Sequence, residues 1–239
     1  MNNTFWQTYW SDKTHGEHRS QAEYFLKKEA AEKLFHLGGG KSLLDFGCGS
    51  ADLLAYYAQA YERTVGCDRS ESMIEKAKER ISRFNLEKGC TLFNADDANV
   101  WQHIREKFGS GFEFDRITAG QVVQYMSREQ IDHFIANASR HLTDKGKICL
   151  FDVVDSRTYE LWRAGLYDEE RMSAKIIFRY FLGRLRRIKN KLTGKPAFDL
   201  GYIYPPALFT TLAEKHRLTV SFTHSMYYEY RYHVVLERK

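Results

Sequence analysis

The sequence predicts an α/β fold: a mostly parallel sheet of seven strands with an antiparallel last strand and helices on both faces. Its 239 residues are 43% hydrophobic, which suits one sizeable core. Strand-like and helical segments alternate from residue 42 to residue 154, as in a parallel sheet that is covered on both faces. The last two strand-like segments, LTVSFTHSM and YRYHVVLERK, are joined by so short a link that only a hairpin can connect them.

The elements follow one another in a regular order. Residues 20–36 carry apolar side chains at roughly helical spacing, and the glycines at 38–40 end that helix. Five strands are expected next, at residues 42–46, 63–68, 90–96, 114–120 and 148–154. Four helices lie between them, at residues 51–61, 70–84 (capped by Ser70), 99–108 and 128–142, and the turn TDKGK follows the last of these. A final helix, PPALFTTLAEKHR, has proline near its start and precedes the hairpin.

The alternation stops between the fifth strand and the final helix. Residues 171–195 hold nine basic side chains and no acid, so the rest of the chain has a net charge of −4 against a total of +5. Apolar side chains recur there every three or four residues, at Ile177, Phe181, Leu185, Ile188 and Leu192. The segment is therefore expected to form a helix. Either its apolar stripe packs on the core and its other faces are solvated, or it is a lid that docks the substrate or its carrier. So local a basic segment argues against a surface that coats nucleic acid.

Composition also bounds the cellular setting. No run of about 18 apolar residues is present, so no membrane span is expected. The start, MNNTFWQTYWSDK, lacks the basic and apolar regions of a secretory signal. The four cysteines lack CxxC spacing and are expected as free buried thiols: Cys48, Cys67, Cys90 and Cys149. The sequence thus predicts a cytoplasmic protein, peripheral to the inner face of a membrane if the basic segment docks there.

The segment SLLDFGCGSADLL, residues 42–54, joins a strand to a helix through a glycine turn. Such a turn directs backbone N–H groups and a helix N-terminus at a ligand, and Gly47 and Gly49 permit close approach of the backbone. Asp68 ends the second strand 21 residues after Gly47 and can accept two hydrogen bonds from ribose hydroxyls. Together these features predict a cofactor that contains adenosine.

Two acids decide between the classes of such cofactors. A nicotinamide-binding turn has a third glycine where this chain has Asp52, whose side chain would crowd and repel a pyrophosphate. A further acid, Asp45, lies two residues before the first glycine. A cationic ligand with a free amino group tolerates acids here, and a diphosphate does not.

The motifs resemble those of the class I S-adenosylmethionine-dependent methyltransferases of the small-molecule type. The resemblance covers residues 20–155 and 200–239. It rests on five pieces in the family's order: LLDFGCGSAD (with Ala51 at the family's last glycine), VGCDRSESMIEKAK, LFNADDA, FDRITAGQVVQYM and LTDKGKICLFD. It implies a Rossmann-like sheet in a single methyltransferase domain over residues 1–239. We expect an N-terminal helical cap at about 1–37 and an inserted basic helical lid at about 156–200.

The resemblance implies roles for the matching residues. The turn at Asp45, Gly47 and Gly49 would hold the methionine part of S-adenosylmethionine, and Asp68 would hold its ribose. Met73 is expected near the adenine. Ala119 would present backbone to the amino-acid end of the cofactor.

Other cofactor contacts follow from the same motifs. Either Asp96 or Asp97 is expected to contact the adenine amino group. The segment LFNAD favours Asp96 as the acid at the strand end, and the segment DDA places Asp97 in the loop. Tyr9 or Trp10 would fold over the sulfonium, which an aromatic face attracts by roughly 1 kcal/mol, or would only pack as part of the cap. The remaining predicted contacts are Arg69, Ala98 and Gln124.

No catalytic base stands out. Many relatives carry histidines after the fourth strand, where this chain has Gln124 and Tyr125. His103, His133 and His141 are expected on covering helices as surface or cap residues. The candidates that remain are His18 and Tyr125. Methyl transfer gains mainly from holding the nucleophile in line, which can supply about 7–11 kcal/mol, and only a hydroxyl acceptor profits from a base. No metal site is predicted.

The sequence therefore predicts transfer of a methyl group from S-adenosylmethionine to a small molecule, with S-adenosylhomocysteine as product. The basic segment suggests an anionic acceptor, a lipid-linked one at a membrane surface, or one borne by an acidic carrier protein. One alternative is a methyltransferase of RNA or protein, although no nucleic acid partner is expected. Another is a non-catalytic or NAD-linked nucleotide-binding protein.

Overall fold

The computed structural model describes residues 23–166, 174–192 and 201–239. Within α8 (Ala174–Leu192), the side chains of residues 187 and 190–192 also lie outside the description. The predictions for Tyr9, Trp10 and His18 fall on residues that the structure does not describe. In the range expected for the N-terminal cap, the structure describes α2 (Glu23–Leu37). In the range expected for the lid, it describes α7 (Tyr159–Arg163) and α8.

The seven strands form one sheet in the order β3-β2-β1-β4-β5-β7-β6. Their bounds are Ser42–Phe46, Arg63–Asp68, Cys90–Asn94, Phe114–Gly120, Leu142–Val154, Leu218–His224 and Arg231–Arg238, from β1 to β7. The last strand, β7, lies between β5 and β6 and runs antiparallel to both, while the other pairs are parallel. The predicted fold class, including the antiparallel last strand, is confirmed.

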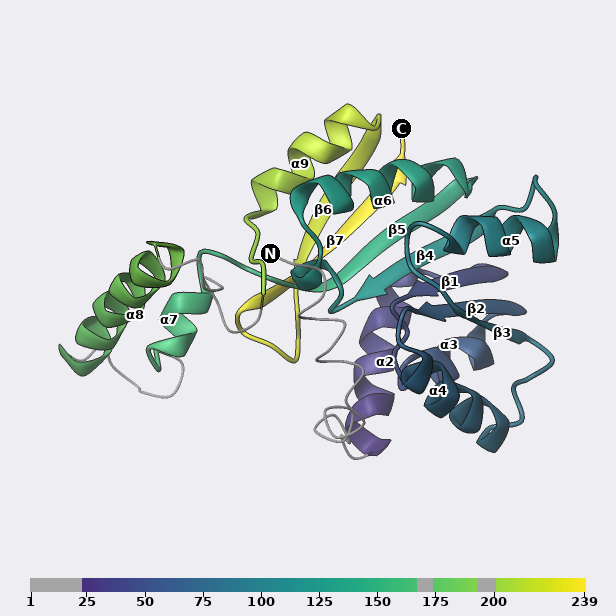
Figure 1. The fold of residues 1–239 in the computed structure, drawn as a ribbon, viewed down its shortest axis with the longest axis horizontal. Helices are drawn as coiled ribbons and strands as arrows, with labels where there is room; N and C mark the ends of the chain where they lie inside the picture. The colour runs from purple at the N-terminus through teal and green to yellow at the C-terminus, as the bar shows by residue number, and fades with distance from the viewer. Residues whose placement is uncertain (1–22, 167–173, 193–200) are drawn as a thin grey trace.

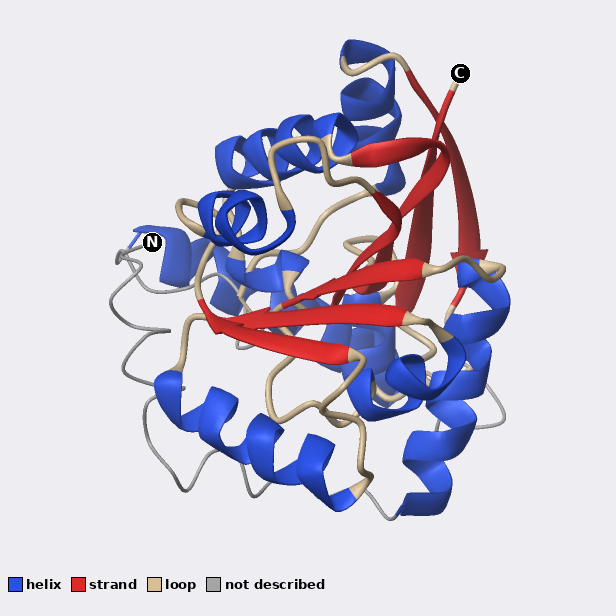
Figure 2. Cartoon of the chain, turned by 90° about the vertical axis from the view of Figure 1, so that its right-hand side faces the viewer, coloured by secondary structure: helices blue, strands red, loops and turns tan. Residues whose placement is uncertain are grey.

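Helices cover both faces of the twisted sheet (Figures 1 and 2). One core lies under α5 (Val100–Phe108), α6 (Arg128–Arg140) and α9 (Pro206–Lys215). The other lies under α2, α3 (Leu54–Ala60) and α4 (Glu71–Arg83). In β1, Leu44 packs into the first core and Leu43 into the second, because successive side chains of a strand point to opposite faces.

Three local details differ from the sequence-based expectations. Helix α3 starts at Leu54 instead of residue 51, because Ala51 has a left-handed φ of 62° that no helix residue adopts. Ser70 is the N-cap of α4, but its side chain makes no capping hydrogen bond. Strand β5 begins at Leu142, and the expected TDKGK turn forms an irregularity within it, since the register with β4 jumps from Leu142 to Lys147.

The described thiols agree with the prediction of free cysteines. Cys48, Cys67 and Cys149 are buried and Cys90 is partly buried, and none forms a disulfide. Burial raises the pKa of the Cys149 thiol to about 12, so this thiol is not reactive near neutral pH. No helix in the described ranges has the length and apolar character that crossing a bilayer requires.

Candidate functional site

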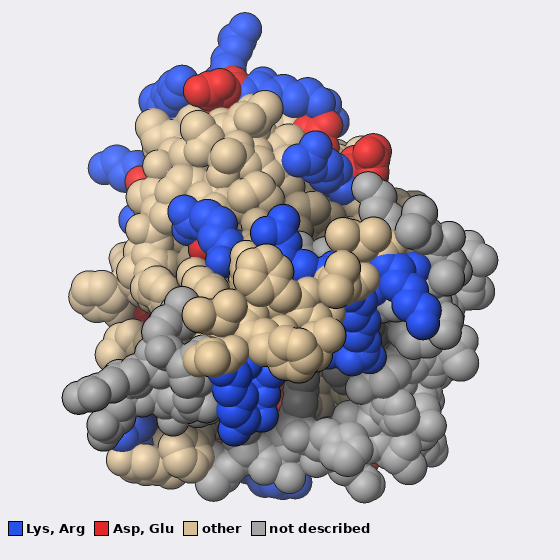
Figure 3. All heavy atoms as spheres, turned by 90° about the vertical axis from the view of Figure 1, so that its left-hand side faces the viewer, with Lys and Arg blue, Asp and Glu red and all other residues tan. Residues whose placement is uncertain are grey.

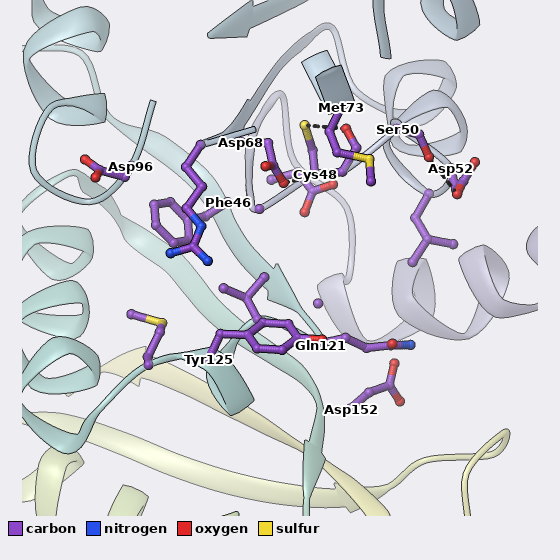
Figure 4. A pocket seen from close by; sticks show the side chains of 18 of the residues that line it. Phe46, Cys48, Ser50, Asp52, Asp68, Met73, Asp96, Gln121, Tyr125 and Asp152 are labelled. Atoms are coloured by element: carbon purple, nitrogen blue, oxygen red, sulfur yellow. Dashed lines mark hydrogen bonds between the residues drawn. The ribbon is translucent and has the colours of Figure 1, made fainter. Parts of the chain in front are cut away.

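A cavity of about 460 Å³ lies at the carboxyl ends of the parallel strands, where loops from β1, β2, β3 and β4 meet. Most of the predicted cofactor contacts line it: Asp45, Gly47, Gly49, Asp68, Arg69, Met73, Asp96, Asp97 and Ala98, together with the base candidate Tyr125. Figure 4 shows Tyr125, Gln121 and Asp152 on the opposite side of this cavity from Asp68, Cys48 and Met73.

The glycine turn is shaped by the ends of β1 and β2. The N–H groups of Gly47 and Cys48 both donate to the Cys67 carbonyl, at 2.8 and 2.9 Å. Gly47 has a φ of 75°, and a Cβ on it would lie 2.4 Å from Cγ2 of Val122. A glycine is therefore required at 47 for two independent reasons, backbone conformation and space.

Asp68 holds this turn to the start of α4. Its carboxylate accepts hydrogen bonds from the N–H groups of Gly49 at 3.1 Å and Ser70 at 2.9 Å. Asp68 is partly buried and lines the cavity at the end of β2. These two donors fix the carboxylate in place beside the cavity.

Asp45 is a buried acid at the end of β1, and only 6% of its surface is exposed. None of the described residues donates a hydrogen bond to its carboxylate, and its nearest charged influence is a second acid. Burial, and then the charge of Asp68, raise the pKa of Asp45 to about 7. A buried carboxylate in this state gains from a positively charged or hydrogen-bond-donating ligand in the cavity.

Asp52 also borders the cavity, but a cation balances its charge. Its carboxylate pairs with the Arg80 guanidinium at 2.5 Å and accepts a hydrogen bond from the Ser50 hydroxyl at 2.9 Å. Asp52 therefore repels a diphosphate less than the sequence argument assumed. Asp45, whose carboxylate has no donor among the described residues, remains the stronger obstacle to a diphosphate.

The loop after β3 contains both adenine-contact candidates. Asp97 accepts hydrogen bonds from the Trp101 indole at 3.1 Å and pairs with His133 Nδ1 at 2.6 Å. Asp96 accepts one from the N–H of Ala98 at 3.0 Å through Oδ1. Asp96 is exposed and Asp97 partly buried, and both side chains border the cavity.

Two predicted contacts lie outside the cavity lining. Ala119 is fully buried in β4, although the next two residues, Gly120 and Gln121, reach the cavity. Gln124 is buried in the short 3-10 helix Val123–Tyr125, and its carbonyl accepts a hydrogen bond from the N–H of Tyr202. Gln121 has a left-handed φ of 56°, which turns the chain sharply where β4 ends.

Several lining residues were not predicted from the sequence. His133, expected as a surface residue, is 63% exposed at its side chain yet borders the cavity through α6. Glu29 comes from α2, Asp152 from β5 and Tyr228 from the loop between β6 and β7. These residues are distant along the chain, and no spacing relates them to the glycine turn.

A buried charged network lies beside this part of the cavity. The Lys33 ammonium, fully buried, is 2.9 Å from Asp152, 2.8 Å from Glu32 and 4.0 Å from Glu29. Burial alone would raise the pKa of Glu32, but hydrogen bonds from His233, Lys33 and the N–H of Met226 outweigh it and lower the pKa to about 2. The network joins α2 to β5 and β7.

Glu32, His36 and His233 also bring possible metal ligands within 4.8 Å of one another. Nδ1 of His233 accepts the N–H of Asp152 at 3.1 Å, so the neutral ring carries its proton on Nε2. That proton points at Glu32, 3.2 Å away, where a metal would have to bind. We therefore interpret the group as part of the structural network.

Comparisons with known proteins agree with this geometry. Residues 44–148 match the family model of a methyltransferase domain. No curated protein matches the chain in sequence. The magnesium protoporphyrin IX methyltransferase ChlM of Synechocystis PCC 6803, solved with bound S-adenosylmethionine, is similar with a TM-score of 0.64 and 14% identity over 100% of this chain and 98% of that one. Its complex with S-adenosylhomocysteine gives 0.65 and 15%, over 100% of both chains.

A third solved structure is similar over only part of its own length. The mitomycin 7-O-methyltransferase MmcR has a TM-score of 0.62 and 15% identity, over 98% of this chain and 60% of that one. At such low identities the likeness establishes the fold alone.

Proposed function

We propose that the chain is a class I, S-adenosylmethionine-dependent methyltransferase that methylates a small molecule in the cavity at the glycine turn, since residues 44–148 match the family model of a methyltransferase domain. One observation carries the assignment of the site: Asp45, a buried carboxylate that faces the cavity without a donor among the described residues and whose pKa is raised to about 7. S-adenosylmethionine carries an ammonium group and a sulfonium, and it would supply the missing positive charge.

The other lining residues fit the remaining parts of this cofactor. Asp68 is held by two backbone N–H groups with its carboxylate beside the cavity, where it would accept the ribose hydroxyls. Gly47 and Gly49 let the backbone approach the amino-acid end. Asp96 is the better adenine contact of the two candidates, because Asp97 is already engaged by Trp101 and His133.

The cofactor, when bound, supplies a methyl group on a positively charged sulfur, and the chain has to position the acceptor in line with it. Tyr125, Gln121 and Asp152 lie across the cavity from the ribose acid and would face the acceptor (Figure 4). Asp152 is held by Lys33 at 2.9 Å and by the Ser225 hydroxyl at 2.8 Å, so it is a fixed acceptor of hydrogen bonds. Positioning of this kind can supply about 7–11 kcal/mol.

The charge of the cavity limits the acceptor. Its lining includes the acids Glu29 and Asp152 in addition to Asp45 and the other acids of the cofactor loops, and Arg69 is the one lysine or arginine among the lining residues that the structure describes. The reacting end of the acceptor is therefore neutral or cationic. An anionic portion, as in a lipid-linked or carrier-bound acceptor, would have to lie outside, toward the basic segment. The choice between an acidic carrier and a membrane depends on the faces of α8.

The test is methyl transfer itself. The full chain is incubated with S-adenosylmethionine labelled in its methyl group and with fractionated cell extract, and labelled small molecules are identified by mass spectrometry. We expect label in a small molecule with the parent, and much less of it with Asp68→Ala when the cofactor is not saturating. Label found only in RNA or protein would contradict a small-molecule acceptor and favour the macromolecular alternative.

A further inference from the structure

Helix α8 turns large apolar side chains toward solvent. Six of them are between 47 and 64% exposed: Ile177, Phe178, Phe181, Leu182, Leu185 and Ile188. At 3.6 residues per turn they fall within an arc of about 140° on one side of the helix. Scattered exposed apolar residues need no explanation, but a continuous stripe of this size indicates an interaction surface.

The opposite side of α8 contacts the rest of the protein. Ile176 is fully buried, and a Cβ at Gly183 would lie 2.7 Å from Oε2 of Glu160 in α7. Both residues lie about half a turn away from the middle of the apolar stripe. The stripe therefore points away from the body of the molecule. A stripe packed on the core, one of the two alternatives that the sequence left open, is contradicted.

Basic residues border the stripe on both sides. Lys175, Arg179 and Arg186 lie beyond one edge and Arg184 beyond the other, and Lys189 lies just inside the first edge, next to Leu182. All five are exposed. No acid occurs between residues 174 and 192. Figure 3 views the side of the molecule that carries α8. It shows uncharged residues, in tan, with Lys and Arg side chains, in blue, around them.

We propose that α8 lies flat on an anionic lipid bilayer, with its apolar stripe in the acyl boundary and its flanking cations on the head groups. This is the geometry of an interfacial helix: an apolar arc, basic edges and no span of the membrane. A second copy of the chain fits the stripe poorly, because like charges on both copies would meet around it. An acidic carrier protein would match the cations but leave the apolar arc in water.

The position of α8 gives this docking a consequence for the site. Strand β5 contributes Asp152 to the cavity and ends at Val154, and α7 begins five residues later and packs against α8. Docking through α8 would thus bring the carboxyl edge of the sheet, where the cavity lies, close to the lipid surface. The docking itself does not depend on the proposed reaction.

Co-sedimentation with lipid vesicles tests the proposal on the full chain. The vesicles are phosphatidylcholine with or without phosphatidylserine, at low salt. We expect the parent to bind the anionic vesicles and to remain in solution with the neutral ones. The double variant Phe181→Glu with Leu185→Glu should bind at least about tenfold more weakly. Phe35→Glu on α2, where the side chain is 81% exposed, is the matched control and should bind like the parent.

A second double variant, Arg184→Glu with Arg186→Glu, tests the charge. It should also weaken binding about tenfold or more, and added salt should weaken binding of the parent. Circular dichroism and the thermal midpoint show that each variant is folded. The proposal is overturned if the parent stays in solution with both kinds of vesicle, or if the stripe variant sediments like the parent. It is equally overturned if light scattering shows a dimer that the stripe variant dissociates, without vesicle binding.

Discussion

Asp45 has a chemical state that the sequence did not reveal. The sequence has this acid two residues before the first glycine of the turn, and its position there predicted a cationic ligand. The structure adds that this acid is buried beside Asp68 and has no donor among the described residues, which raises its pKa to about 7. A carboxylate kept in this state weakens the protein without ligand and strengthens the binding of a cation.

Asp45→Asn tests this trade-off through its pH dependence. The folded pKa lies above the unfolded value of 3.8, so the parent is destabilised progressively as pH rises from about 4 to 7. The variant should therefore be more stable than the parent, by up to roughly 4 kcal/mol above pH 7 and by less at pH 5. Urea unfolding at pH 5 and pH 8 measures this difference. An equal effect at both pH values would contradict the raised pKa.

Ala51 shows how far a motif predicts backbone conformation. It stands at the family's last glycine, and the structure gives it a left-handed φ of 62°. The motif thus identified the position at which the backbone is left-handed, a conformation that favours glycine. The periodicity of ADLLAYYAQAY did not detect the turn, because apolar spacing reports the buried face of a helix and not where its backbone begins.

At the level of elements, the strands were predicted more accurately than the connections between them. Strands β1, β2 and β4 have the predicted bounds, since each is a short buried apolar run between polar residues. The register jump in β5 and the buried network around Lys33 were not predicted, because both depend on contacts between segments far apart in sequence. The final hairpin was predicted from loop length alone.

Lys33 should be essential for joining α2 to the sheet. Its fully buried ammonium faces three carboxylates, so Lys33→Met leaves uncompensated charge and should lower the free energy of unfolding by about 3–5 kcal/mol. Lys27→Met, an exposed position on the same helix, is the control and should change it by less than about 0.5 kcal/mol. Chemical unfolding measures both. Equal effects for the two variants would show that the network contributes no stability.

The end of α9 offers a stabilising substitution. Arg217 follows the C-cap of this helix, is exposed and has a left-handed φ of 56°. Arg217→Gly should stabilise the protein by about 1 kcal/mol, because glycine adopts this conformation without steric cost.

Asn85 after α4 provides the comparison for that substitution. It has a similar φ of 57°, but asparagine tolerates the left-handed region. Asn85→Gly should therefore gain only a few tenths of a kcal/mol. Urea midpoints compare the two variants with the parent, and a larger gain at Asn85 would contradict the explanation from backbone conformation.

At the scale of the whole molecule, charge is divided between two regions. Among the described residues that line the cavity, the charged ones are mainly acids, and α8 carries exposed cations around an apolar stripe. The sequence predicted the basic segment and a mildly acidic remainder of the chain, but not that acids gather at the cavity. It did not predict that the apolar stripe faces outward, because the spacing of apolar residues identifies a helix face but not what covers it.

The most direct test of the central assignment is calorimetric titration of the full chain with S-adenosylmethionine, S-adenosylhomocysteine and NADH, for the parent, Asp68→Ala and Glu79→Ala. Glu79 is an exposed acid on α4 and serves as control. We predict that the parent binds the first two compounds and not NADH. Loss of the ribose hydrogen bonds in Asp68→Ala should weaken binding by roughly 10- to 150-fold, while Glu79→Ala binds like the parent. Binding of NADH in place of S-adenosylmethionine, or unchanged affinity in Asp68→Ala, would contradict the assignment of this cavity.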